Sequence, residues 1–194
     1  MSKDEHIDLE LLVGGDHRNV IDSYKNWTVE AIKTDLSHKS FPYHIAIENY
    51  QHDFNMGTIV RNANAFNAAG VHIVGRRKWN HRGAMATEKY LELYYHDSIE
   101  SFLAWAAKAD MRLIGIDNIA TSLPLQRSEL PRNAVYIFGQ EGPGLSEDLQ
   151  KRCEYLIAIE QFGSTRSVNV GVASGIIMYE WVRRNVNILS TESK

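Results

Sequence analysis

The sequence predicts an α/β protein whose parallel sheet is flanked by helices. Short runs of β-type residues alternate with segments of helical period from about residue 43 to residue 185, a pattern typical of parallel sheets. The chain has 194 residues, 44% apolar and 23% charged, so it can bury the core of one ordinary domain. Polar or glycine-rich segments follow three of the expected strands, which is where open α/β sheets bind ligands.

Each expected element follows from local signals. Apolar runs bounded by polar or glycine residues indicate strands, whereas apolar residues three or four positions apart indicate helices. The expected strands are His44–Ile47, Val71–Val74, Arg112–Ile116, Val135–Phe138 and Leu156–Ile159. The expected helices are Thr58–Ala69, Ser98–Ala109, one that begins at about Glu147, and Val170–Asn185.

The chain divides into an N-terminal helical extension, residues 1–40, and a main domain, residues 41–194. Residues 1–20 have little periodicity and include Gly14-Gly15, so we expect a mobile or loosely docked lead. Apolar residues then recur at helical spacing from Val20 to about Ser37. Phe41-Pro42 ends this helix, because the residue before a proline is pushed out of the α region.

Composition excludes several classes of protein. The longest apolar run, near Gly171–Met178, is far shorter than the ~20 residues of a membrane-spanning helix, and the polar start at Met1 does not resemble a signal peptide. The single Cys153 excludes an internal disulfide, fits a cytoplasmic location and is expected to be a small buried hydrophobe. A net charge of −3 argues against a protein that coats nucleic acid indiscriminately, but it allows a local basic patch. The eight histidines are scattered, so we expect no metal site.

The first polar segment is Asn55-x-Gly57-x-x-x-Arg61, at the start of an expected helix. Polar side chains within a packed helix are costly unless they are paired or used. The segment therefore indicates a site. The alternative is that Asn55 caps the helix and Arg61 reaches the solvent.

The second and third polar segments follow later strands. Gly139-Gln140-Glu141-Gly142-Pro143-Gly144-Leu145-Ser146 lacks the lysine of a P-loop and the glycine spacing of a dinucleotide fold. Its Glu141 would repel a phosphate, so Glu141 either belongs to another kind of site or neutralises a nearby arginine. The third segment, Ser164–Asn169, ends where Asn169 suits the N-cap of the last helix.

Together these segments resemble the motifs of the SpoU, or TrmH-like, family of RNA ribose 2′-O-methyltransferases in the SPOUT superfamily. The resemblance covers about residues 43–185, and the sequence departs from the family pattern at Asn67, where the family usually has glycine. The matching segments are Asn55-Met56-Gly57-Thr58-Ile59-Val60-Arg61-Asn62-Ala63 with Phe66 in place, Gly139–Ser146, and Ser167-Val168-Asn169-Val170.

For the fold, the resemblance implies a C-terminal deep trefoil knot, which periodicity alone does not indicate. It also implies a homodimer through the last helix, with Trp181 as the anchor, although the same residues could be buried within one subunit. The apolar residues that suit this interface are Ile176, Ile177, Tyr179, Trp181 and Val182. The cofactor implied is S-adenosylmethionine, bound by the loops after three late strands. The cofactor contacts transferred from the family are Gly139, Gly144, Ile159, Val168 and Asn169.

For the activity, the resemblance implies methyl transfer to a ribose 2′-hydroxyl in tRNA or rRNA. A free guanidinium is practically never deprotonated, so we expect Arg61 to orient the hydroxyl, grip a phosphate and pair with Glu141. The alternative function is a catalytically silent RNA-binding protein of the same fold. The catalytic residues that the family indicates are Arg61, Asn55, Glu141, Ser167 and Asn169.

A basic segment after the second expected strand is the candidate RNA surface. Four cations lie close to Trp79 there, and cations with an aromatic ring are the usual means of single-stranded RNA recognition. The alternative is a solvated charged loop. The expected RNA-binding residues are Arg61, Arg76, Arg77, Lys78, Arg82 and Arg166.

Overall fold

A computed structural model describes residues 6–50 and 55–187 and confirms the α/β class. Its sheet has seven strands in the order β3-β2-β1-β6-β4-β7-β5, and every pair of neighbours is parallel. The strands are β1 (Phe41–Asn49), β2 (Ala68–Gly75), β3 (Leu93–His96), β4 (Arg112–Ile116), β5 (Leu123–Pro124), β6 (Ala134–Phe138) and β7 (Tyr155–Ala158). The α-helices are α1 (Leu9–Gly14), α2 (Val29–Lys39), α3 (Met56–Ala65), α4 (Ile99–Lys108), α5 (Glu147–Gln150) and α6 (Val170–Asn185).

Short 3-10 helices complete the connections: η2 (Asp22–Tyr24), η3 (His81–Ala84), η4 (Thr87–Lys89) and η5 (Leu125–Arg127). Two predicted helix boundaries are wrong. Helix α3 stops at Ala65 rather than Ala69, because Asn67 adopts a left-handed backbone with φ of 49° and β2 begins directly after it. The first long helix begins at Val29 rather than Val20, where the Thr28 side chain accepts the Ala31 N–H as an N-cap.

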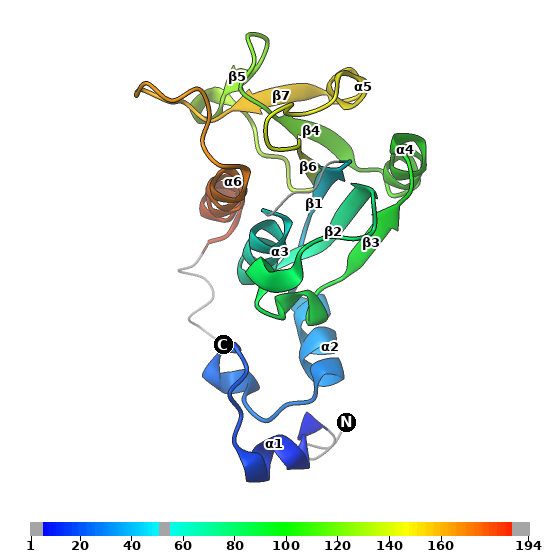
Figure 1. The fold of residues 1–194 in the computed structure, drawn as a ribbon, viewed down its shortest axis with the longest axis vertical. Coiled ribbons are helices and arrows are strands. Elements are labelled where there is room, and N and C mark those ends of the chain that lie inside the picture. Colours follow the sequence, from blue (N-terminus) through cyan, green and yellow to red (C-terminus); the bar gives the residue numbers. More distant parts are fainter. Residues whose placement is uncertain (1–5, 51–54, 188–194) are drawn as a thin grey trace.

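Two apolar cores lie on opposite faces of the sheet. Helices α3 and α6 cover one face, and α4 and α5 cover the other (Figure 1). Side chains alternate along β1, so Ile45 and Ile47 belong to the first core whereas Ala46 belongs to the second. Cys153 packs against the second core as predicted, and burial raises the pKa of its thiol to about 12.

A chain of histidines crosses the α4 face of the sheet. The His44 Nδ1 lies 2.9 Å from the His72 Nε2, and the His72 Nδ1 lies 2.9 Å from the His96 Nε2. The Trp105 ring packs 3.8 Å from the His72 ring. Burial lowers the pKa of His44 to about 4 and that of His72 to about 2. These rings are therefore neutral at pH 7, and each hydrogen bond joins one ring N–H to one ring nitrogen.

Side-chain hydrogen bonds hold the described part of the N-terminal extension together. The Asp16 carboxylate accepts hydrogen bonds from the Arg18 guanidinium and the Asn26 N–H, and Arg18 holds the pKa of Asp16 well below its usual range. The extension meets the main domain through a 2.9 Å ion pair between Lys33 and Glu92. The hydrogen bonds of Asp16 and Arg18 lie within the extension, so loose docking of residues 6–20 on the main domain stays a prediction, and residues 1–5 lie outside the described residues.

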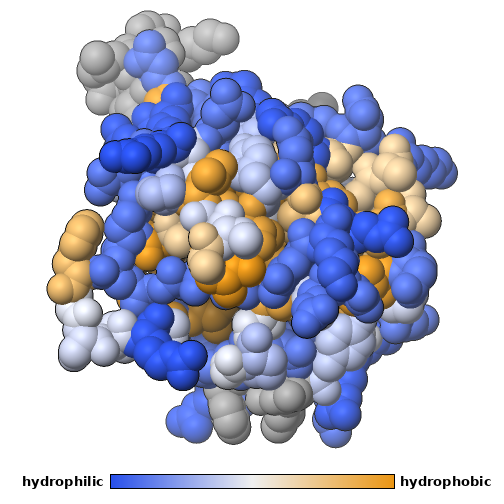
Figure 2. All heavy atoms as spheres, turned by 90° about the horizontal axis from the view of Figure 1, so that it is seen from above, coloured by the Kyte–Doolittle hydropathy of each residue, from blue (hydrophilic) through white to orange (hydrophobic). Residues whose placement is uncertain are grey.

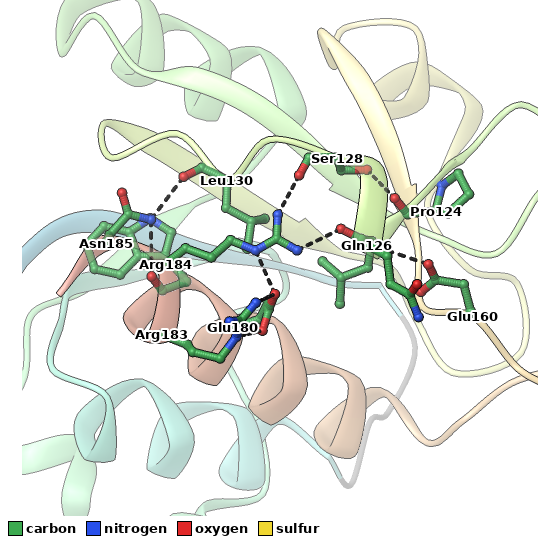
Figure 3. Close-up of polar contacts among 11 residues, drawn as sticks. Pro124, Gln126, Ser128, Leu130, Glu160, Glu180, Arg183, Arg184 and Asn185 are labelled. Carbon is green, nitrogen blue, oxygen red and sulfur yellow. Dashed lines mark hydrogen bonds and ion pairs between the residues drawn. The ribbon is translucent and has the colours of Figure 1, made fainter. Parts of the chain in front are cut away.

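The C-terminal half of α6 is fastened to the segment between β5 and β6 (Figure 3). The Arg184 guanidinium donates to the Ser128 carbonyl at 2.6 Å and to the Leu125 carbonyl at 2.9 Å, and the Asn185 amide donates to the Leu130 carbonyl. Arg183 and Arg184 together lower the pKa of Glu180 to about 2. Helix α6 is thus fixed at its C-terminal end by hydrogen bonds to backbone carbonyls of the 125–130 segment.

Trp181 is a core residue and not the exposed interface anchor that the sequence predicted. Its side chain has no solvent exposure, and its ring lies 4.3 Å from the ring of Tyr43 and 5.5 Å from that of Phe41. The indole N–H donates to the Pro131 carbonyl at 2.9 Å. Ile177 is also fully buried. The side of α6 that carries these residues therefore faces the sheet.

We predict that Trp181→Ala lowers the free energy of unfolding by about 3–5 kcal/mol, because it removes a large buried ring and leaves a cavity. Trp181→Phe is the matched control, since it keeps an aromatic ring and loses only the indole donor to Pro131. Urea unfolding followed by circular dichroism measures both. A loss below about 1 kcal/mol in the alanine variant, the size of an average substitution, contradicts the core assignment.

Candidate active site

Three loops after β4, β6 and β7 meet around one cavity of about 280 Å³. Viewed from the end that carries β5 and β7, hydrophobic surface gathers near the centre of the molecule and hydrophilic residues surround it (Figure 2). The apolar wall of the cavity consists of Ile116, Phe138, Ile157, Ile159, Val168, Val170 and Ala173. The polar side chains in its wall are Asp117, Asn118, Gln140, Glu141, Gln161, Ser167 and Asn169. An apolar cavity with a few convergent polar groups is typical of a small-molecule site.

The glycine-rich loop after β6 is folded tightly back on itself. The backbones of Gln140 and Gly144 exchange two 3.0 Å hydrogen bonds. A Cβ at Gly139 would lie 2.1 Å from the Gly144 carbonyl carbon, so no larger residue fits at Gly139. Gly144 has a φ of 76°, which glycine adopts without strain. These glycines bring main-chain groups, rather than side chains, to the cavity.

Two carboxylates that the sequence analysis did not assign to the site hold this loop from behind. Asp117 Oδ2 accepts the Leu145 N–H at 2.9 Å, and Glu48 Oε2 accepts the Ser146 N–H at 2.7 Å. Glu48 is fully buried at the end of β1. Its signal in the sequence is a charged residue within an apolar strand, which is costly unless the charge is hydrogen-bonded.

The three sequence motifs meet in one hydrogen-bond network. The Asn55 Nδ2 donates to Glu141 Oε2 at 2.6 Å, and the Asn169 Nδ2 donates to Asn55 Oδ1 at 2.9 Å and to Glu141 Oε1 at 3.5 Å. The Asn169 Oδ1 accepts the N–H groups of Gly171 and Val172 and so caps α6, as the sequence predicted. Residues more than eighty positions apart in the chain are therefore joined at the mouth of the cavity.

The predicted ion pair between Arg61 and Glu141 is wrong. The two Glu141 oxygens accept from the amides of Asn55 and Asn169, and the structure contains no ion pair between Glu141 and Arg61. Arg61 lies on the exposed side of α3, facing away from the core that buries Val60 and Ala63. Amide donors thus satisfy the carboxylate, and the guanidinium is left exposed to solvent.

Helices α3 and α6 are locked together behind this network. The Asn62 amide donates to the Gly171 carbonyl at 2.9 Å and to the Ser174 hydroxyl at 3.0 Å. A Cβ at Gly171 would lie 2.9 Å from the Thr58 methyl group, so the two helices approach too closely for a larger residue there. This contact sets the position of the first motif relative to the third.

The structure brings together most of the predicted site residues. All five predicted cofactor contacts line the cavity, as do Glu141 and Ser167. Asn55 reaches the cavity through its bonds to Glu141 and Asn169, whereas Arg61 is not among the residues that line it. Arg166 is exposed, and its carbonyl accepts the Asn118 amide at 3.2 Å.

The basic segment after β2 is exposed, but Trp79 is not. Arg76, Lys78 and Arg82 are exposed, while Arg77 lies 3.6 Å from an Asp97 carboxylate oxygen. Trp79 is only 5% exposed. The prediction that Trp79 provides a surface for base stacking is therefore wrong.

The described residues contain no group of three or more His, Cys, Asp or Glu side chains placed to hold a metal ion. Within the same residues, no helix has the length and apolar character needed to cross a membrane.

Comparison with known proteins identifies the family. A model described as the SpoU rRNA Methylase family matches residues 42–179. The 23S rRNA (guanosine-2′-O-)-methyltransferase RlmB of Salmonella typhi is 29% identical over 150 residues, which are 74% of this chain and 60% of that protein. The chain thus spans about 60% of the length of this relative.

Two solved structures share the fold. An AdoMet-bound rRNA methyltransferase from Sinorhizobium meliloti superposes with a TM-score of 0.67 at 23% identity, over 78% of this chain and 61% of that one. The TrmH/SpoU tRNA modifying enzyme of A. aeolicus gives a TM-score of 0.70 at 21% identity, over 80% of this chain and 81% of that one. Because the family model matches most of the chain and includes all three motifs, the protein belongs to the SpoU rRNA Methylase family.

Proposed function

We propose that this protein transfers a methyl group from S-adenosylmethionine to a ribose 2′-hydroxyl of tRNA or rRNA. The observation that carries the proposal is the network of Asn55, Glu141 and Asn169 at the mouth of the three-loop cavity. Support also comes from the name of the RlmB relative, a guanosine-2′-O-methyltransferase, and from the bound AdoMet of the Sinorhizobium meliloti structure.

The cavity suits S-adenosylmethionine in shape and chemistry. Its apolar wall matches an adenine ring, and the main-chain groups of the tight loop at Gly139 and Gly144 are free of side chains that would block a ligand. We assign the adenine contacts to Gly139, Ile159 and Val168. When bound, the cofactor supplies a methyl group already activated by the sulfonium charge, so the protein has to align the acceptor oxygen and assist loss of its proton.

Each polar residue of the network has a role in this proposal. Asn55 and Asn169 hold Glu141 and thereby fix the glycine-rich loop against α6. Ser167 and Asn169 shape the side of the cavity where the ribose enters. Arg61 orients the 2′-hydroxyl and binds a neighbouring phosphate, because an exposed guanidinium presents two parallel N–H donors to such a group.

The proposal includes the deep trefoil knot and the domain division. Contacts between the segment after β4 and the chain between β7 and α6 support the knot: Asn118 donates to the Arg166 carbonyl, and Glu160 accepts the Gln126 N–H. Residues 1–40 form an extension with its own contacts, such as that of Asp16 with Arg18, and residues 41–194 form the methyltransferase domain. The single Cys153 suits action in the cytoplasm.

Titration calorimetry with S-adenosylmethionine, followed by transfer of its labelled methyl group to bulk tRNA and rRNA, tests the function. We expect saturable binding of one cofactor per chain and ribose methylation in one RNA pool. Cofactor binding without transfer to either pool contradicts the proposed acceptor. The absence of both binding and transfer identifies the alternative, a silent RNA-binding protein.

We predict that Arg61→Ala lowers the rate of methyl transfer by about 100-fold or more, as removal of one preorganised charged donor does elsewhere. Affinity for S-adenosylmethionine should stay within a few-fold, because Arg61 does not line the cavity. Arg61→Lys should also transfer methyl groups slowly, because the single ammonium group of lysine cannot replace the paired N–H donors of a guanidinium. Arg152→Ala removes another exposed arginine and serves as the control. Wild-type rates in the Arg61→Ala variant remove Arg61 from the mechanism.

We predict that replacing Arg76–Lys78 with alanine weakens RNA binding and makes its log–log dependence on salt shallower by up to about three. Each phosphate contact releases counterions when it forms, so the loss of a contact reduces the number of ions released. Replacement of Lys108, Lys151 and Arg152 removes three cations elsewhere and should change the slope less. Fluorescence anisotropy with labelled tRNA at several salt concentrations gives both slopes. Equal slopes in the two variants place the RNA surface away from residues 76–82.

The proposal further includes a homodimer in which a second copy covers the exposed side of α6. Tyr179 is 58% exposed and Val172 is 54% exposed on that side, and Ile176 lies between them at helical spacing. These residues replace Trp181 as the expected interface. A contiguous apolar stripe of this kind is typical of an interaction surface.

We predict that Tyr179→Glu gives monomers that lose methyl transfer and keep their fold. Leu12→Glu, a change at a similarly exposed apolar residue of α1, is the control and should leave the dimer intact. Sedimentation at micromolar concentration distinguishes the two states. A fully active wild-type species of 22.1 kDa, the mass of one chain, contradicts the dimer.

A further inference from the structure

We infer that Phe162, together with Arg166, forms a stacking platform for an unpaired nucleobase of the RNA. This inference rests on the proposed function and narrows its substrate to RNA whose target nucleotide lies in a single-stranded region. Phe162 is 91% exposed, which is the largest exposed fraction among the large hydrophobic residues of the described chain.

Phe162 stands at the rim of the cavity and not on a remote surface. Its neighbour Gln161 lines the cavity, and so do Ser167 and Val168 at the other end of the same loop. Ile119 is 37% exposed beside the lining residue Asn118. Phe162 and Ile119 are therefore exposed apolar residues that follow lining residues of the cavity in two of the three loops.

The loop that carries Phe162 is anchored on both sides of its tip. Before the tip, the Glu160 carboxylate accepts the Gln126 N–H at 3.0 Å (Figure 3). After the tip, the Asn118 amide donates to the Arg166 carbonyl at 3.2 Å. Two anchored ends limit the movement of the loop and leave the Phe162 ring exposed to a flat partner.

The loop also offers a cation to a phosphate. Two charged side chains lie between β7 and α6: Glu160, whose carboxylate accepts the Gln126 N–H, and Arg166, which is exposed. An exposed ring and an exposed guanidinium on one short loop can stack one base and contact its phosphate. A base can stack on Phe162 only when it has left its own helix, so the platform selects unpaired nucleotides.

The test compares a fluorescein-labelled 12-nucleotide single-stranded RNA with the same strand annealed to its complement. Fluorescence anisotropy gives the affinity of the full-length protein for each. We expect Phe162→Ala to weaken single-strand binding about 10-fold, as the removal of one base-stacking contact does elsewhere. Affinity for the duplex should change little. Phe162→Tyr should restore binding. Val13→Ala, which shortens an apolar residue that is 89% exposed on α1, should have no effect.

Three readings separate the outcomes. Unchanged single-strand affinity in Phe162→Ala overturns the inference while leaving the proposed function intact. Conversion of a dimeric wild type to monomers by Phe162→Ala overturns it as well, because Phe162 then belongs to a protein interface. Affinity for S-adenosylmethionine, measured by calorimetry, should be equal in all four proteins. If the wild type does not bind S-adenosylmethionine, the proposed function is refuted, whereas the anisotropy result still decides the role of Phe162.

Discussion

The side chain of Asn169 is the contact on which the site depends. Its Oδ1 accepts two N–H groups at the start of α6, while its Nδ2 donates to Asn55 and Glu141. One amide therefore ends the loop after β7, begins the last helix and joins the other two motifs. An amide suits this position because it donates and accepts at once, whereas a carboxylate could only accept.

The hydrogen bonds of Asn169 are effective because other contacts fix the segments that they join. Arg184 and Asn185 fasten the far end of α6 to backbone carbonyls of the 125–130 segment. Asn62 fastens its near end to α3. The buried Glu48 holds the glycine-rich loop that carries Glu141. Positions fixed in this way require little ordering when ligands bind, which is the general advantage of a preorganised site.

Much of the fold could be predicted because local signals determine it. Helix α6 begins and ends at the predicted residues Val170 and Asn185, since Asn169 caps its start. Strand β4 matches the prediction at both ends. The sheet also contains β5, which was not predicted as a strand. Strand β5 has only two residues and lies at the edge of the sheet, so its pairing with β7 depends on tertiary structure and not on a local pattern.

The sequence by itself determined the α/β class and the three motifs, because strand and helix periods and loop composition are properties of neighbouring residues. Only the tertiary structure decided which side chains meet and which are buried. Trp79 and Trp181 look alike as exposed aromatic anchors in the sequence, yet both are buried, and Trp181 packs against Phe41 and Tyr43 of the distant strand β1. Likewise Glu141 is paired with two amides rather than with Arg61. Burial and pairing depend on the packing of separate elements, which no local pattern records.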